Sequence, residues 1–184
     1  MAMTVQPLAI PEVILLEPVL HTDARGHFFE AWNASEFAEI TGHTGGFAQD
    51  NQSQSRAGVL RGLHYQLPNP QGKLIRVVTG AAFSVAIDIR RSSATFGDWV
   101  SAELSADNHC QLWIPPGFAH GFLAREDGTE MIYKVTDFYA PGCDRSIRWD
   151  DPAIGIEWPL GDLTPVLSLR DAEAPLLADA EVFD

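Results

Sequence analysis

Short runs of alternating apolar and polar residues recur along most of this chain. After an N-terminal run at 13–20, they cover residues 47–55, 81–90, 99–108, 111–124 and 130–142. Successive side chains of a strand point to opposite faces, so such alternation is typical of half-buried strands. Gly and Pro separate the runs and helical periodicity is scarce, which predicts an all-β sandwich or barrel.

The segment 58–80 is the most unusual part of the pattern. Its apolar β-forming residues surround the turn-rich stretch LPNPQG at 67–72, which predicts a hairpin. Arg61 and His64 would lie on the first arm and Lys73 at the start of the second. Polar groups among buried strands cost free energy unless they are satisfied or used. The alternative to a functional site is that His64 is an ordinary hydrogen-bonded core histidine and that the Lys73 side chain reaches out to solvent.

Helical signals are few. Residues 33–41 predict one short helix, with Asn33 or Ser35 as its N-cap. The Pro-rich stretch 148–177 predicts irregular structure and a short helix packed against the sheets. Tyr133 and Tyr139 are six residues apart, an even spacing that puts both on one face of a regular strand.

Composition narrows the function. The 184 residues are 46% hydrophobic, so residues 1–184 are expected to form a single domain with a proper core. Only 12 Lys and Arg face 25 Asp and Glu, a net charge of -13 that argues against nucleic-acid binding. Cations for an anionic ligand must therefore be concentrated at its site, and Arg25, Arg61 and Lys73 are the candidates.

The two cysteines, Cys110 and Cys143, fit neither a disulfide framework nor a zinc spacing, and small buried hydrophobes are their simpler interpretation. The sequence shows no signal peptide and no long apolar span. A reduced, cytoplasmic protein that does not bind membranes is expected.

Two segments resemble the paired motifs of the cupins, small double-stranded β-helix jelly rolls that often hold a metal. The second motif, P-x-G-x-x-H, stands at Pro115, Gly117 and His120. The resemblance implies a cupin-type jelly roll with short peripheral helices.

The first cupin motif is altered. Metal-binding cupins have H-x-H followed by Glu, whereas this chain has His64, Gln66 and then Lys73, with six residues between Lys73 and Gly80. An amide is a poor replacement for a ligating imidazole, and an ammonium adds positive charge where a carboxylate would supply negative charge. No metal is expected, and the site would suit an oxyanion.

The wider pattern resembles the dTDP-4-dehydrorhamnose 3,5-epimerase family over nearly the whole chain. The matching pieces are DARGHFFE, QDNQSQS, VLRGLHYQ, QGKLIRVVTG, FGDW, WIPPGFAHGF, YKVTDFYAPG, RWDDPAIGIEWP and LSLRDAEAP. The chain departs from the family pattern at Asp144, Ser146 and Arg170, where Glu, Gly and Lys are usual, and these departures leave the exact sugar open.

The resemblance implies a catalytic set without a cofactor. His64 is the base, Asp171 its partner, Lys73 the stabiliser of the oxygen on carbon 4, and Tyr133 the acid on the opposite face. Loss of a proton next to a carbonyl gives an enolate, so the reaction needs a base, a fixed positive charge and a second proton carrier. Without the resemblance, Tyr133 would be a packed strand aromatic and Asp171 a surface charge or cap.

The same resemblance implies the ligand and the partner. Guanidinium groups suit the pyrophosphate of a dTDP-sugar. The substrate-binding residues it implies are Arg25, Phe28, Glu30, Gln49, Asn51, Arg61, His120 and Tyr139. Family members are homodimers that exchange N-terminal segments, so some of these residues are expected to serve the neighbouring subunit.

Two other functions stay open at this point. One is a metal-dependent cupin oxygenase, which Gln66 and Lys73 disfavour. The other is a non-catalytic jelly roll that binds a sugar nucleotide, which the presence of the base and acid disfavours. Neither the number of inverted carbons nor the pathway, rhamnose or a secondary-metabolite sugar, follows from any single residue.

Overall fold

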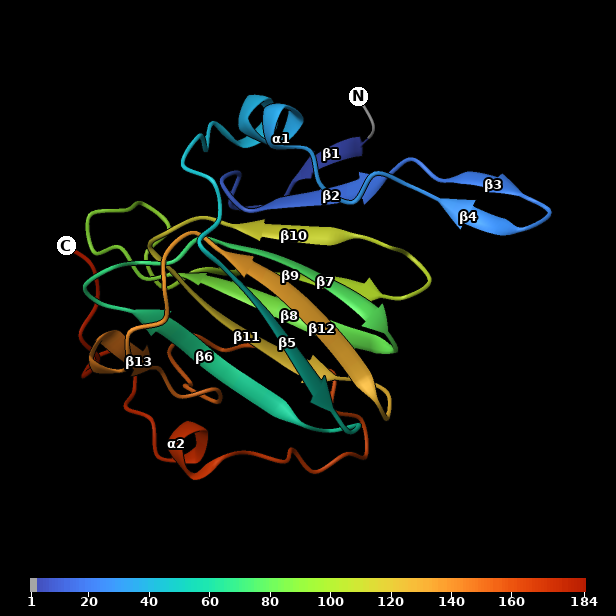
Figure 1. Cartoon of the computed structure of the whole chain (residues 1–184). Coiled ribbons are helices and arrows are strands. Elements are labelled where there is room, and N and C mark those ends of the chain that lie inside the picture. The colour runs from blue at the N-terminus through green and yellow to red at the C-terminus, as the bar shows by residue number, and fades with distance from the viewer. Residues whose placement is uncertain (1–2) are drawn as a thin grey trace.

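The computed structural model describes residues 3–184, and two antiparallel sheets form most of it (Figure 1). The six-stranded sheet contains, in spatial order, β1 (Met3–Pro7), β2 (Ile14–Pro18), β10 (Gln111–Ile114), β7 (Lys73–Thr79), β12 (Thr129–Val135) and β5 (Gln49–Ser55). The five-stranded sheet contains β13 (Asp144–Ser146), β6 (Leu60–Gln66), β11 (Phe118–Ala124), β8 (Ala81–Asp88) and β9 (Trp99–Ser105). The all-β prediction is confirmed.

The main core lies between the two sheets. Ile75 and Met131 of the six-stranded sheet pack with Ala86 and Phe122 of the five-stranded sheet, and all four are almost completely buried. Alternation in β8 explains the arrangement, because Ala82, Ala86 and Ser84, which bonds to His120 of the cavity, face inward while Val85 and Ile87 face the other way. Burial on both faces makes β8 a central strand.

Further elements cover the outer faces of both sheets. Helix α1 (Ala34–Thr41) packs Phe37 against Trp113 on the six-stranded sheet, and Asn33, one of the two predicted N-caps, caps it. The C-terminal segment covers the five-stranded sheet with Ile147 and Leu177. It contains helix α2 (Leu169–Ala172), the short helix expected there.

The hairpin predicted over residues 58–80 is wrong. Its two arms, β6 and β7, are strands of different sheets, and the stretch 67–72 crosses from one sheet to the other. β6 pairs with β11 and β13, whereas β7 pairs with β10 and β12. Both arms are apolar enough to be buried, and the pattern cannot tell a tight hairpin from such a crossover. The polar residues of the two arms consequently face each other across the sandwich.

A second correction concerns the tyrosines. β12 ends at Val135, so Tyr133 lies on the strand and Tyr139 lies on the loop that follows it. Their even spacing therefore does not align them on one strand. The run 111–124 is also interrupted, because Pro115 and Gly117 separate β10 from β11.

The hairpin of β3 (His21–Asp23) and β4 (Gly26–Phe28) extends away from the barrel (Figure 1). Its Phe28 side chain is 71% exposed, an unusual position for a large aromatic ring.

None of the helices within residues 3–184 has the length and apolar character needed to cross a membrane.

Candidate active site

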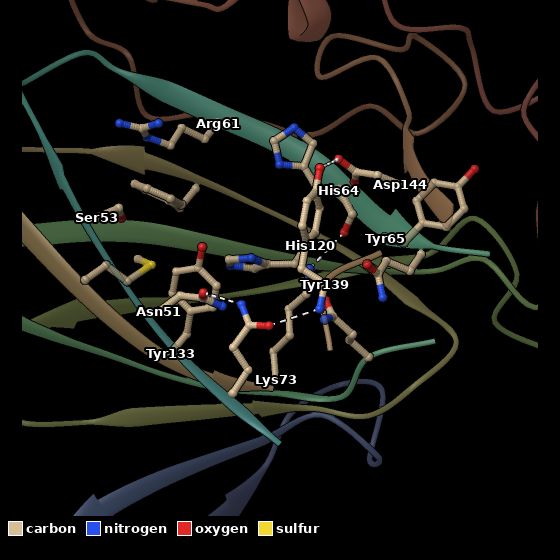
Figure 2. A pocket seen from close by; sticks show the side chains of 15 residues that line it. Asn51, Ser53, Arg61, His64, Tyr65, Lys73, His120, Tyr133, Tyr139 and Asp144 are labelled. Atoms are coloured by element: carbon tan, nitrogen blue, oxygen red, sulfur yellow. Dashed lines mark hydrogen bonds between the residues drawn. The ribbon is translucent and has the colours of Figure 1, made fainter. Parts of the chain in front are cut away.

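A cavity of about 370 Å³ opens between the two sheets. Figure 2 shows its walls, with Arg61 and His64 along β6 and Tyr133 on β12. The lining residues are Gln49, Asn51, Ser53, Arg61, His64, Tyr65, Gln66, Gln71, Lys73, His120, Phe122, Met131, Tyr133, Tyr139 and Asp144. Most of them are polar, which is rare inside a β-sandwich and marks a binding site.

His64 and Asp171 form a hydrogen-bonded pair at one wall of this cavity. The His64 Nε2 atom lies 2.5 Å from Asp171 Oδ1. Burial of Asp171 opposes ionisation, but the hydrogen bond and charge of His64 lower the pKa of the carboxyl below its ordinary value. An ionised carboxylate only accepts hydrogen bonds, so the ring proton is assigned to Nε2. Nδ1 has no partner among the described residues and is left as the basic nitrogen.

Helix α2 holds Asp171 in place. The Ser168 hydroxyl caps the helix by accepting from the Asp171 backbone N–H at 3.1 Å. Arg170 donates to both carboxylate oxygens of Asp144 and to the Ser146 hydroxyl. Because β13 carries Asp144 and Ser146 and pairs with β6, these contacts tie the helix to the strand that carries His64.

A bulge in β6 brings Arg61 and His64 to the same cavity. His64 lies opposite His120 of β11, and Arg61 lies opposite Phe122, so β6 has one more residue than its partner over this stretch. Gly62 occupies the bulge at φ +125°, and a Cβ there would meet the Gly121 Cα at 2.5 Å. In a regular strand, residues 61 and 64 would face opposite sides.

Lys73 provides a buried positive charge. Its side chain comes from β7, is 7% exposed as a residue, and donates to the His64 carbonyl oxygen at 3.0 Å. Burial lowers the pKa of Lys73 from 10.5 to about 8, with the Asp144 charge opposing that effect. The ammonium form therefore predominates at neutral pH, although burial destabilises it.

His120 is a buried neutral histidine. Its Nε2 atom lies 2.9 Å from the Ser84 hydroxyl. Burial and the charges of Lys73 and His64 hold the pKa of His120 well below its ordinary value. A neutral imidazole can donate from one nitrogen and accept at the other, which suits a polar contact to a ligand.

Tyr133 faces the cavity from the six-stranded sheet. Burial raises the pKa of its phenol above the ordinary value, with the Arg61 charge opposing. The phenol is therefore protonated at neutral pH. Its hydroxyl makes no hydrogen bond within the described part of the chain, so its proton is available to a ligand.

Gln66 anchors the loop that carries Tyr139. Its amide nitrogen donates to the carbonyl oxygens of Asn69 and Phe138, and its amide oxygen accepts from the Ala140 N–H at 2.7 Å. The Tyr139 hydroxyl in turn donates to Asp144 at 3.0 Å. The Gln66 amide is thus fully used in holding this loop.

Residues 3–184 contain no cluster of three or more His, Cys, Asp and Glu side chains suited to a metal ion.

Three predicted binding residues lie away from this cavity. Arg25 and Phe28 are on the projecting β3–β4 hairpin, where Arg25 pairs with Asp23 and its side chain is 90% exposed. Glu30 accepts from Asn33 beside helix α1. The other predicted residues, His64, Lys73, Tyr133, Asp171, Gln49, Asn51, Arg61, His120 and Tyr139, line the cavity or contact a residue that does.

Sequence reasoning missed several residues of the cavity wall. Ser53 follows Gln49 and Asn51 at alternate positions of β5, so the strand pattern contained a signal for it. Its hydroxyl is the one buried side-chain polar atom in residues 3–184 without a hydrogen-bond partner. Asp144 enters the wall through β13, and no spacing in the sequence indicates that contact.

The arrangement is suited to moving protons on a carbonyl compound. It combines an imidazole oriented by a carboxylate, a buried ammonium and a protonated phenol around one cavity. The imidazole and the phenol come from different sheets, β6 and β12, so they approach a bound molecule from different sides. Such a set can remove a proton, stabilise the resulting oxyanion and return a proton elsewhere.

Comparison with known proteins is consistent with this chemistry. The model of the dTDP-4-dehydrorhamnose 3,5-epimerase family matches residues 7–179. A dTDP-4-dehydrorhamnose 3,5-epimerase from Pseudomonas aeruginosa is 53% identical over 176 residues, which cover 96% of this chain and 97% of the relative.

Solved structures are similar over the same length. A dTDP-6-deoxy-D-glucose-3,5-epimerase from Legionella pneumophila, in complex with dTDP-4-keto-L-rhamnose, is 46% identical with a TM-score of 0.93 and coverage of 96% and 93%. A 3'-monoepimerase from Streptomyces bikiniensis, in complex with dTDP-quinovose, is 37% identical with a TM-score of 0.88 and coverage of 94% and 87%. The predicted cupin-type fold is confirmed by these neighbours.

Proposed function

This chain belongs to the dTDP-4-dehydrorhamnose 3,5-epimerase family, and from that premise we propose which of its residues move the protons. The protein is an epimerase that inverts carbon 3, carbon 5 or both in a dTDP-4-keto-6-deoxyhexose of deoxysugar biosynthesis. Both carbons are adjacent to the carbonyl at carbon 4, so loss of either proton gives an enolate whose negative charge rests on the oxygen of carbon 4.

His64 is the base and Asp171 orients it. Inversion also requires a proton to return to the opposite face of the carbon, and Tyr133 delivers it. The observation that carries this proposal is that His64 and Tyr133 come from opposite sheets and face one cavity. Lys73 stabilises the enolate oxygen, because a buried ammonium acts in a low dielectric and needs little reorganisation during the reaction.

The remaining polar residues of the cavity bind the sugar nucleotide. Arg61 uses one side of its guanidinium on Ser55 and the Gln54 carbonyl, at 3.2 Å each, and keeps further N–H donors for a phosphate. Gln49, Asn51, His120 and Tyr139 supply donors, acceptors and a ring for the sugar and the base. No metal or other cofactor is needed, because Lys73 already supplies the positive charge.

The experiment follows carbons 3 and 5 by NMR in deuterium oxide, with a dTDP-4-keto-6-deoxyhexose as substrate. His64→Asn should abolish both deuterium uptake and inversion. The loss of rate should be at least about 10²–10⁴-fold, the range typical of general acid–base catalysis. Tyr133→Phe keeps the base and loses the acid. It should take up deuterium at carbon 3 or 5 with little inversion, because the enolate is quenched from the face it left.

Two outcomes would contradict these roles. Normal inversion by Tyr133→Phe, or deuterium uptake at the native rate by His64→Asn, would favour a route through one residue or through water. Binding of the substrate without any uptake in the unmodified protein would favour the non-catalytic alternative. A requirement for one divalent metal would favour the metal-dependent one.

We further propose that the protein is a homodimer in which the β3–β4 hairpin completes the neighbouring subunit's site. The hairpin projects from its own barrel and carries the exposed Phe28 and Arg25, which is how a segment that binds elsewhere would be arranged (Figure 1). A cytoplasmic location belongs to the same proposal, and the free thiols of Cys110 and Cys143 are consistent with a reducing compartment.

Mixed dimers test the exchange. His64→Asn, expected to be inactive alone, and Arg25→Ala, expected to be weakly active alone, should regain activity when the two proteins are unfolded together and refolded. In the mixed dimer one site then has an intact His64 and receives an intact Arg25 from its neighbour. Failure of the mixture to exceed the separate proteins, with mixed dimers demonstrated by mass, would show that both residues act within one chain.

A further inference from the structure

The two histidines of the main cavity lie directly opposite each other but have different partners. His64 of β6 and His120 of β11 form a cross-strand pair. His64 is bonded to the Asp171 carboxylate. The Nε2 atom of His120 instead lies 2.9 Å from the Ser84 hydroxyl. A carboxylate only accepts hydrogen bonds, whereas a hydroxyl can also donate one. The two rings can therefore hold their protons on different nitrogens.

Ser84 is a polar residue in an apolar part of the core. It is completely buried on β8, and its cross-strand neighbours are Ala102 of β9 and Phe122 of β11. Within residues 3–184, His120 is its only hydrogen-bond partner. Burying a hydroxyl without a partner costs free energy. The contact with His120 is thus the interaction that explains a polar side chain at this position.

The direction of this hydrogen bond fixes the tautomer of His120. If the Ser84 hydroxyl accepted from Nε2–H, its own proton would have no acceptor in the described part of the chain. Buried donors without an acceptor are rarer than acceptors with an unused lone pair. The hydroxyl is therefore assigned as the donor, and the proton of the neutral ring is assigned to Nδ1.

The Nδ1 atom of His120 is open to the main cavity. It has no hydrogen-bond partner among the described residues, yet it is not one of their fully buried atoms, since Ser53 Oγ is the one such side-chain atom without a partner. The accessible space at His120 is the main cavity (Figure 2). Lys73 leaves Nδ1 free, because its ammonium donates to the His64 carbonyl oxygen. A bound ligand thus meets an N–H donor here.

The surroundings of His120 keep its ring neutral. The ionisable side chains that line the cavity with it are Arg61, His64, Lys73, Asp144 and the phenols Tyr65, Tyr133 and Tyr139. Asp144 is the only carboxylate among them and is bonded to Arg170. Burial, and for Tyr139 the hydrogen bond to Asp144, raise the pKa of the phenols, which are uncharged at neutral pH. Burial, together with Lys73 and His64, holds the pKa of His120 well below its ordinary value.

We propose that Ser84 is a positioning residue of the epimerisation, which fixes His120 as a neutral Nδ1–H donor toward the oxygen on carbon 4 of the sugar. The proposal rests on the proposed function and on the role of Lys73 in it. Lys73 Nζ bonds the backbone of His64, the residue paired with His120, so both donors belong to one part of the cavity. Negative charge on that oxygen grows as the enolate forms, and a second, uncharged donor stabilises it further.

The first test examines the ring nitrogens and needs no substrate. A long-range nitrogen–proton NMR spectrum of the labelled protein, with His120 identified by its loss in His120→Gln, should show Nδ1 protonated and Nε2 unprotonated. His120 should not titrate between about pH 6 and pH 9. Ser84→Asp places a carboxylate beside Nε2, which should then become protonated, as it is in His64. A protonated Nε2 in the unmodified protein would overturn the proposal.

Turnover of a dTDP-4-keto-6-deoxyhexose connects the tautomer to the reaction. Ser84→Ala removes the donor to Nε2 and allows either tautomer, so kcat should fall about tenfold with little change in KM. Ser84→Thr keeps a hydroxyl and should restore both kcat and the His120 spectrum. Thr129→Val is the control, because the Thr129 hydroxyl is also buried but contacts no histidine and lies outside the cavity. It should lower stability and leave kcat unchanged.

Two kinetic outcomes contradict the proposal. Lower stability of Ser84→Ala with unchanged kcat and an unchanged His120 spectrum would mean that the hydroxyl serves only the packing of the core. A raised KM with unchanged kcat would mean that the donor acts on a part of the ligand whose charge does not change. If a variant does not fold, the spectrum of the unmodified protein still decides the tautomer. An unmodified protein without any inversion would refute the proposed function and leave that spectrum as the test of Ser84.

Discussion

Replacing Lys73 by methionine should stabilise the fold and nearly abolish turnover. The Lys73 side chain is buried, and burial lowers its pKa from 10.5 to about 8 on folding. A difference of that size corresponds to about 3 kcal/mol of destabilisation at pH 7. Loss of the hydrogen bond from the Lys73 Nζ atom to the His64 carbonyl subtracts about 1 kcal/mol. Methionine has a similar unbranched shape, so the free energy of unfolding should rise by about 2 kcal/mol.

The dependence of stability on pH tests independently whether burial of the Lys73 ammonium destabilises the folded protein. Between pH 8 and 10.5 the unfolded chain keeps the Lys73 proton while the folded protein releases it. The unfolded state therefore binds more protons, and the unmodified protein gains stability as the pH rises through this window. The advantage of Lys73→Met should shrink by about 1 kcal/mol between pH 7 and pH 9.

Urea unfolding at several pH values and steady-state kinetics measure both effects. Turnover of Lys73→Met should fall by about 10²–10³, the usual cost of losing a group that stabilises an oxyanion. Turnover of the unmodified enzyme should also decline as the pH rises through about 8. A variant less stable than the unmodified protein at pH 7 would refute the account of burial. A variant that keeps its turnover would refute the role of the charge.

The remaining predictions concern binding and cofactors. Arg61→Ala should raise KM about 10- to 100-fold with little change in kcat, because a charged hydrogen bond to phosphate is equally strong in ground and transition states. The control is Arg56→Ala, since Arg56 lies outside the cavity. Equal losses in KM and kcat would mean that Arg61 acts on the reacting sugar. Dialysis against a chelator should leave activity unchanged, and activity lost to the chelator and restored by one divalent metal would contradict the assigned role of Lys73.

The fold class was accessible from local patterns. Alternating runs mark most strands because a strand buried on one face must repeat apolar residues every two positions. The helix at 34–41 follows from the capping side chain of Asn33, which acts within a few residues. The site residues His64, Lys73, Tyr133 and Asp171 came from the resemblance to a family, since polar residues among apolar strands show that a site exists and not what it does.

Long-range geometry was not accessible in the same way. The sequence predicted a hairpin where β6 and β7 belong to different sheets, because a turn-rich segment between apolar runs allows a tight turn or a crossover. In a regular strand, Arg61 and His64 would point to opposite faces. The bulge at Gly62, which depends on close contact with Gly121, brings them to one cavity.

By itself the sequence determined most of the segments that become strands, the presence of one short helix at residues 33–41 and which residue types are available for catalysis. Each of these depends on interactions within a few residues. Only the tertiary structure decided that Asp171 meets His64 across 107 positions and that Asp144 and Lys73 line the same cavity. Such contacts depend on how the two sheets and the C-terminal segment pack together, and packing is a property of the whole chain.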